Sequence, residues 1–110
     1  MKQLEAKRIA RIESLFREVN ERIAESAERF EADEAEFVCE CDDPTCTTRV
    51  PHTLAAYDKV RADGTTFLLR PGHDNETVER VVEAGEHHVV VEKTDPVVAL
   101  LVAKLNPRPS

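Results

Sequence analysis

The first 30 residues carry a seven-residue apolar repeat, and this repeat limits the shapes that the chain can adopt. The repeat has two rows of residues seven positions apart, Ile9, Phe16, Ile23 and Phe30, and, three positions after the first three of these, Ile12, Val19 and Ser26. The spacing predicts one long amphipathic helix with a coiled-coil seam over residues 1–35. A helix of about 30 residues is on the order of 45 Å long. Its seam is expected to meet either a second copy or a partner protein, or else the rest of its own chain.

All three cysteines of the chain lie within eight positions, in the stretch FVCECDDPTC. An extended strand up to Cys41 would point Cys39 and Cys41 to the same face, with Cα atoms roughly 6.6 Å apart. That distance is at the outer limit for a disulfide, whereas a metal ion accepts it. The following DPTC has the composition of a type I turn, which folds Cys46 back toward the other two. The sequence therefore predicts three converging sulfur atoms.

Tetrahedral zinc needs a fourth ligand, and the chain offers four histidines. His73 closes the stretch RPGH, in which Pro-Gly fits the middle of a type II turn. His52 is close to the cysteines in sequence and is the alternative ligand, with an acidic side chain or water as a third possibility. His87 and His88 are adjacent on an expected strand, point to opposite faces, and are expected on the surface of a hairpin. The predicted zinc ligands are Cys39, Cys41, Cys46 and His73, although spacing alone does not separate zinc from iron.

Acidic residues surround the cysteines. Residues 31–46 contain seven acidic residues and no basic one, in a chain of net charge −7. A phosphate backbone is repelled by such a segment, so no nucleic-acid partner is expected, while a divalent cation is attracted. No apolar run is long enough to cross a bilayer, and the N-terminus lacks the apolar core of a secretory signal. We therefore expect a bacterial cytoplasmic protein, without membrane contact, whose thiols stay reduced.

Short elements follow the cysteines. A helix over 54–63 is expected to start at the N-cap Thr53, and a helix over 96–105 to start at Thr94 or Asp95. The strands are expected at 65–69, 77–83 and 87–93, the last two forming a hairpin in which Gly85 supplies a positive φ. The fold class is α+β, with a long N-terminal helix over 1–35, a zinc-stabilised head over 36–106 that holds a short antiparallel sheet and a C-terminal helix, and a disordered tail over 107–110.

The cysteine stretch, the segment TLAAYDKVRADGTTFLLRPGH and the segment VERVVEAGEHHVVVEK together resemble a family of short bacterial proteins of unassigned function. That family has a Cys-x-Cys-x4-Cys knuckle and a downstream Pro-Gly-His turn. The matching positions are Cys39, Cys41, Cys46, Tyr57, Arg61, Phe67, Pro71, Gly72, His73 and Lys93. Two positions depart from the pattern, Ala56 in place of an acid and His88 in place of an aromatic residue. The resemblance implies a shared site and no particular activity.

The predicted function follows from the size of the head and from the ligand set. About 75 residues are near the limit at which a hydrophobic core alone sustains a fold, so the zinc is expected to be structural. Three sulfurs and one nitrogen leave no coordination position for water, and no catalytic motif is present, so no enzyme is expected. We expect an interaction (adaptor) or regulatory module whose long helix docks or dimerises. Two alternatives are a zinc-linked thiol redox switch and a small metallohydrolase with Glu40 or Asp42 as base.

Overall fold

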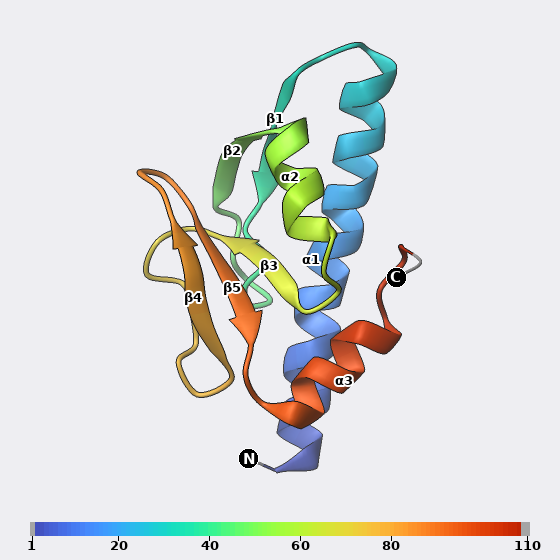
Figure 1. The fold of residues 1–110 in the computed structure, drawn as a ribbon. Coiled ribbons are helices and arrows are strands. Elements are labelled where there is room, and N and C mark those ends of the chain that lie inside the picture. Colours follow the sequence, from blue (N-terminus) through green and yellow to red (C-terminus); the bar gives the residue numbers. More distant parts are fainter. Residues whose placement is uncertain (1, 109–110) are drawn as a thin grey trace.

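The computed structural model describes residues 2–108. The elements in chain order are α1 (Gln3–Arg29), β1 (Glu34–Val38), β2 (Arg49–Thr53), α2 (Leu54–Arg61), β3 (Thr66–Leu69), β4 (Glu79–Ala84), β5 (Val89–Lys93) and α3 (Pro96–Lys104). The strands form a two-stranded sheet, β1-β2, and a three-stranded sheet, β3-β5-β4, and every pair is antiparallel. This arrangement confirms the predicted α+β class with a long N-terminal helix, short antiparallel sheets and a C-terminal helix (Figure 1).

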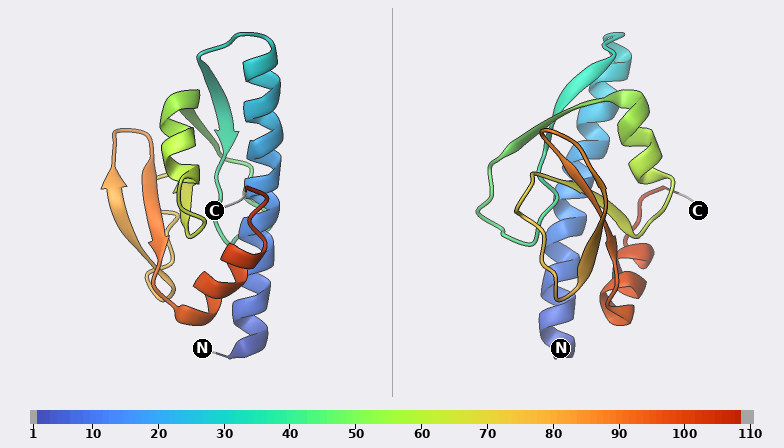
Figure 2. Two further views of the ribbon diagram at one scale, coloured as in Figure 1. Left: turned by 45° about the vertical axis from the view of Figure 1, so that its right-hand side comes forward. Right: turned by 60° about the vertical axis from the view of Figure 1, so that its left-hand side comes forward.

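Helix α1 folds over its own domain, which is one of the two expected arrangements. Its 27 residues are about 40 Å long, close to the longest dimension of the molecule, 43 Å. Strand β1 runs beside the C-terminal half of the helix, and α3 crosses its N-terminal half (Figure 2). The chain after the helix is therefore long enough to pack along most of it.

The face of α1 that packs against the domain differs from the predicted seam. The buried face consists of Ala6, Ile9, Ala10, Glu13, Ser14, Arg17 and Asn20. Of the seam residues, only Ile9 is fully buried, whereas Val19 and Phe30 are 45% and 79% exposed. The apolar repeat did not identify this face because several of its buried residues are polar or charged and form hydrogen bonds inside the protein. The Arg17 guanidinium, for example, donates to the carbonyl oxygens of Gly64 and Val102 at 2.7 Å each.

The long helix ends at Arg29 and does not continue to residue 35. Glu31 adopts a left-handed conformation with φ 57°, and the amide of Ala32 donates to the carbonyl of Ala27 at 2.8 Å. The chain therefore reverses direction and enters β1, which pairs with β2, a strand that the sequence analysis did not predict.

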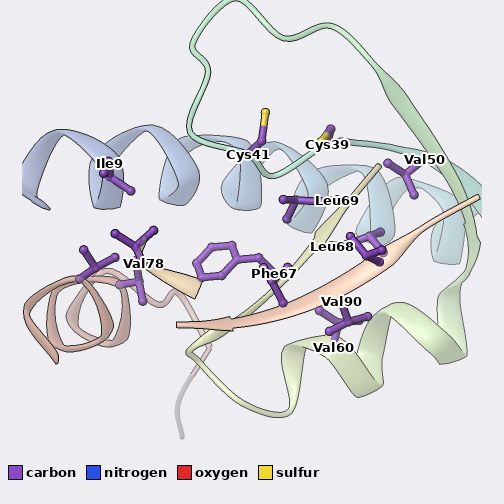
Figure 3. Close-up of a cluster of buried hydrophobic side chains, with 14 of the residues drawn as sticks. Ile9, Cys39, Cys41, Val50, Val60, Phe67, Leu68, Leu69, Val78 and Val90 are labelled. Carbon is purple, nitrogen blue, oxygen red and sulfur yellow. The ribbon is translucent and has the colours of Figure 1, made fainter. Parts of the chain in front are cut away.

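The core lies between α1, the three-stranded sheet and α3, with Phe67 near its centre (Figure 3). Two cations approach the Phe67 ring. The Arg17 guanidinium carbon and the Lys93 Nζ lie 4.6 Å and 4.9 Å from its centroid. Lys93 forms buried ion pairs with Glu13, at 2.6 Å, and with Glu79. Burial raises the pKa of Glu13 to about 8, although the nearby ammonium group opposes this shift.

Most of the later elements lie where they were predicted. The side chains of Thr53 and Asp95 cap α2 and α3 by accepting from the amides of Ala56 and Val98. In the expected tail 107–110, Arg108 pairs with Glu21 and Asp58, and residues 109–110 lie outside the described part. No helix within residues 2–108 has both the length and the apolar character needed to cross a membrane.

Candidate metal centre

The four predicted ligands, Cys39, Cys41, Cys46 and His73, converge in the structure. Their three sulfur atoms and one ring nitrogen all lie within 4.8 Å of one another. The His73 Nδ1 is 3.5 Å from the Cys39 Sγ and 3.7 Å from the Cys46 Sγ. Zinc bonds of about 2.3 Å to sulfur and 2.0–2.1 Å to nitrogen give a sulfur-to-nitrogen edge of about 3.6 Å in a tetrahedron. The observed distances match that edge, so this group of side chains has the spacing of a tetrahedral metal site.

The first two cysteines follow β1 and do not lie in a strand, contrary to the sequence prediction. Strand β1 ends at Val38; Cys39 still pairs with the residue directly before β2, and Glu40 then pairs with β3. The amide of Cys39 donates to the Thr48 carbonyl at 3.0 Å, and the amide of Glu40 donates to the Leu68 carbonyl at 2.9 Å. Both cysteines are buried at the edge of the core (Figure 3). The sulfur atoms of both cysteines belong to the same group of ligand atoms.

Both predicted turns form, and each presents a ligand as its fourth residue. The amide of Cys46 donates to the Asp43 carbonyl at 3.1 Å, and the amide of His73 donates to the Arg70 carbonyl at 3.1 Å. Gly72 has φ 86°, as the third position of a type II turn requires. Cys46 and His73 are 27 residues apart in sequence, and both approach the buried cysteines from these turns.

Glu40, between the first two cysteines, is an anchor for this segment. Although it is acidic, Glu40 is fully buried. Its carboxylate accepts hydrogen bonds from the Asn20 side chain at 2.8 Å, the Tyr57 hydroxyl at 2.6 Å and the Leu68 amide at 2.9 Å. Both oxygens of Glu40 accept from protein donors, so the side chain holds this segment in place. Burial raises its pKa, and the three donors oppose that shift.

The thiols of Cys39 and Cys41 differ in their readiness to ionise. The hydrogen bond between the first two thiols lowers the pKa of Cys41 to about 5 and, together with burial, raises the pKa of Cys39. The amide of Arg70 donates to the Cys39 sulfur at 3.3 Å, which favours its thiolate. Cys46 is half-buried and His73 is exposed. The group therefore has a buried half and a half that solvent reaches.

The alternative ligand His52 does not approach the cysteines. It lies in β2, and its ring packs against that of His88 with centroids 4.4 Å apart and planes tilted by 49°. Burial lowers the pKa of His52, and the neighbouring His88 lowers it further. His88 is thus half-buried, contrary to the expectation that both hairpin histidines sit on the surface, whereas the side chain of His87 is 65% exposed.

Two residues that position the site were not predicted as part of it. The Asn20 side chain bonds both the amide and the carbonyl of Val38, at 2.7 and 2.8 Å, so it fixes the end of β1 directly before Cys39. Asn75 donates to the Asp42 carboxylate at 2.9 Å and links the cysteine loop to the segment before β4. Neither has a sequence signal, since a single amide side chain is uninformative until its neighbours in space are known.

Comparisons with family models, with curated proteins and with solved structures found no match to this chain. The resemblance to a family of short bacterial proteins therefore stays a prediction.

Proposed function

We propose that this protein is a cytoplasmic zinc-binding interaction (adaptor) or regulatory module, in which Cys39, Cys41, Cys46 and His73 hold a structural Zn²⁺. The observation that carries the proposal is the match between the sulfur-to-nitrogen distances, 3.5 and 3.7 Å, and the edge of a zinc tetrahedron. A Cys₃His set is one of the usual ligand sets of structural zinc sites. All four positions are then filled by protein, which is why a structural role is favoured over a hydrolytic one.

The proposed zinc joins parts of the chain that share no strand pairing. The cysteines belong to the loop between β1 and β2, whereas His73 belongs to the loop between β3 and β4. The two sheets are separate. One ion bound across these loops adds a cross-link between the sheets, and it ties down a segment whose backbone has few ladder hydrogen bonds. This is the contribution that a small head needs from a metal.

The proposed interaction surface is an apolar stripe on the outer face of α1. The stripe consists of Ile12, Leu15, Phe16, Val19 and Phe30, of which Leu15, Val19 and Phe30 are exposed and the other two are half-buried. Exposed apolar residues along one side of a helix are typical of surfaces that bind another helix. We propose that it binds a second copy of this chain or a partner protein.

Cobalt substitution tests the metal assignment. With one equivalent of Co²⁺, the wild type is expected to show the intense d-d and sulfur-to-cobalt bands of a tetrahedral three-sulfur site. His73→Ala should alter these bands, because water replaces a nitrogen ligand, whereas His52→Ala should leave them unchanged. The opposite pattern in the two variants would assign the fourth position to His52 and overturn the ligand set.

A zinc-linked redox switch is the second candidate, and the exposure of one edge of the site favours it. Cys46 is half-buried, so a peroxide can reach its sulfur. In the proposed oxidation, Cys46 and Cys41 give two electrons to hydrogen peroxide and form a disulfide. The O–O bond of the peroxide breaks, its two oxygen atoms leave as water after protonation, and Zn²⁺ is released. Stoichiometric peroxide with a zinc-sensitive dye tests it. Zinc retained after such treatment would exclude the switch and leave the structural site intact.

A further inference from the structure

A second cluster of ligand-type side chains lies away from the cysteines. His52, Glu83 and His88 place two ring nitrogens and a carboxylate oxygen within 4.8 Å of one another. The two rings are tilted by 49° with centroids 4.4 Å apart, and the His88 Nε2 is 2.8 Å from the Glu83 Oε2. His52 comes from β2, Glu83 from β4, and His88 from the residue directly before β5. The chain therefore brings the three together from two different sheets.

We infer that His52, Glu83 and His88 form a second metal site, which binds a divalent ion of the zinc, cobalt or nickel class through two imidazoles and one carboxylate. Nitrogen and oxygen ligands of this kind suit those ions. Metal bonds of 2.0–2.1 Å place neighbouring ligand atoms about 2.9–3.4 Å apart. The nitrogen-to-oxygen distance of 2.8 Å is close to that range, so the ion takes the place of the hydrogen bond with a small movement of the side chains.

The turn of the hairpin is built around the His88 ring. A Cβ atom on Gly85 would lie 2.3 Å from the His88 Cε1, so only glycine leaves room for the ring in this position. The turn is closed by the Gly85 amide, which donates to the His88 carbonyl at 2.9 Å. Gly85 is not among the residues with positive φ, which corrects the reason expected for it. Its role in the structure is to accommodate a ligand-type side chain.

The second site differs from the cysteine centre in what it does for the molecule. Three protein ligands leave at least one coordination position for water, so the ion is expected to exchange more readily than one held by four. An ion here joins β2 to the β4-β5 hairpin, two parts that share no strand ladder. The site therefore acts as an exchangeable cross-link between the two sheets, occupied according to the availability of the ion.

Calorimetric titration of Zn²⁺ into protein that already holds one equivalent tests the second site. The wild type is expected to bind a second equivalent, and His88→Ala and Glu83→Gln to bind it at least about tenfold more weakly. His87→Ala is the matched control, since His87 lies in the same turn with an exposed side chain, and it should bind like the wild type. Imidazole NMR signals of His52 and His88 should shift with the second equivalent, and those of His87 should not.

Two further variants separate this site from the cysteine centre and from folding defects. Cys46→Ser should still show the heat of Zn²⁺ binding to the second site, even if this variant no longer holds Zn²⁺ at the cysteine centre. Gly85→Ala keeps every ligand but displaces the His88 ring, and it should weaken the second site while circular dichroism shows the native fold. The inference is wrong if no second equivalent binds, if His87→Ala loses it as His88→Ala does, or if His52→Ala and His88→Ala both retain it.

Discussion

Removing the Tyr57 hydroxyl tests how the segment between the first two cysteines is held. Tyr57 is fully buried, and its hydroxyl donates to Glu40 at 2.6 Å. Tyr57→Phe keeps the ring, which stacks on Phe37 at 4.3 Å, so no large cavity forms. Because the lost bond is to a buried charged group, the free energy of unfolding is expected to fall by about 1.5–3 kcal/mol.

The assay is urea unfolding of the metal-loaded protein at several pH values. With one donor fewer, the already raised pKa of Glu40 rises further, so the folded variant binds its proton at a higher pH than the folded wild type. The loss of stability should therefore be largest at high pH and shrink as pH falls and Glu40 becomes protonated in both proteins. Arg80→Gln, which removes the exposed pair with Glu92, is the control and should change stability by less than about 0.5 kcal/mol. A Tyr57→Phe effect no larger than that of the control would refute the anchoring role of Glu40.

Three further predictions concern the core, the helix stripe and the proline turn. Burial raises the pKa of Glu13 to about 8, so the stability that this side chain contributes below its unfolded pKa is lost as the pH rises through 8. The urea midpoint of the wild type should therefore decline between pH 7 and 9, and Glu13→Gln should flatten that decline. Equal declines in the two proteins would contradict this. Val19→Glu should shift a wild-type dimer to monomer in light scattering with metal content unchanged, and a monomeric wild type would refute dimerisation. Gly72 has φ 86°, and no atom lies within 4 Å of a Cβ added there, so the strain of Gly72→Ala comes from the backbone alone. This variant should lower the free energy of unfolding by about 1–2 kcal/mol and weaken metal binding at His73. Unchanged stability and metal affinity would show that the turn tolerates alanine.

The elements with local signals could be predicted from the sequence. The side chains of Thr53 and Asp95 cap helices by accepting from the amide three residues later, and Gly72 occupies the turn position that requires a positive φ. The same local chemistry predicted the two turns that present Cys46 and His73 as their fourth residues. The convergence of these residues depends in addition on the tertiary structure, which brings the loop between β3 and β4 to the cysteine loop. Signals of this kind depend on a few neighbouring residues, and they do not require the tertiary structure.

The buried face of α1 could not be predicted, because the prediction assumed that buried helix positions are apolar, and several residues of this face are polar or charged. Glu13, Arg17 and Asn20 are fully buried, and an apolar periodicity assigns such residues to solvent. Their burial is tolerated only because Lys93, backbone carbonyls and the end of β1 supply partners from distant parts of the chain. The contact between His52 and His88 is hidden for the same reason, since it joins two sheets whose packing the sequence does not encode locally.

The metal content of protein purified without added metal tests the central claim most directly. After dialysis into metal-free buffer, the account predicts one equivalent of zinc per chain in the wild type, and in His87→Ala as control. Cys46→Ser and His73→Ala should each retain much less, because a three-ligand remnant binds zinc more weakly and exchanges it. Wild-type protein without metal, protein with iron and its visible charge-transfer colour, or zinc that stays bound in both ligand variants would contradict a zinc centre at Cys39, Cys41, Cys46 and His73.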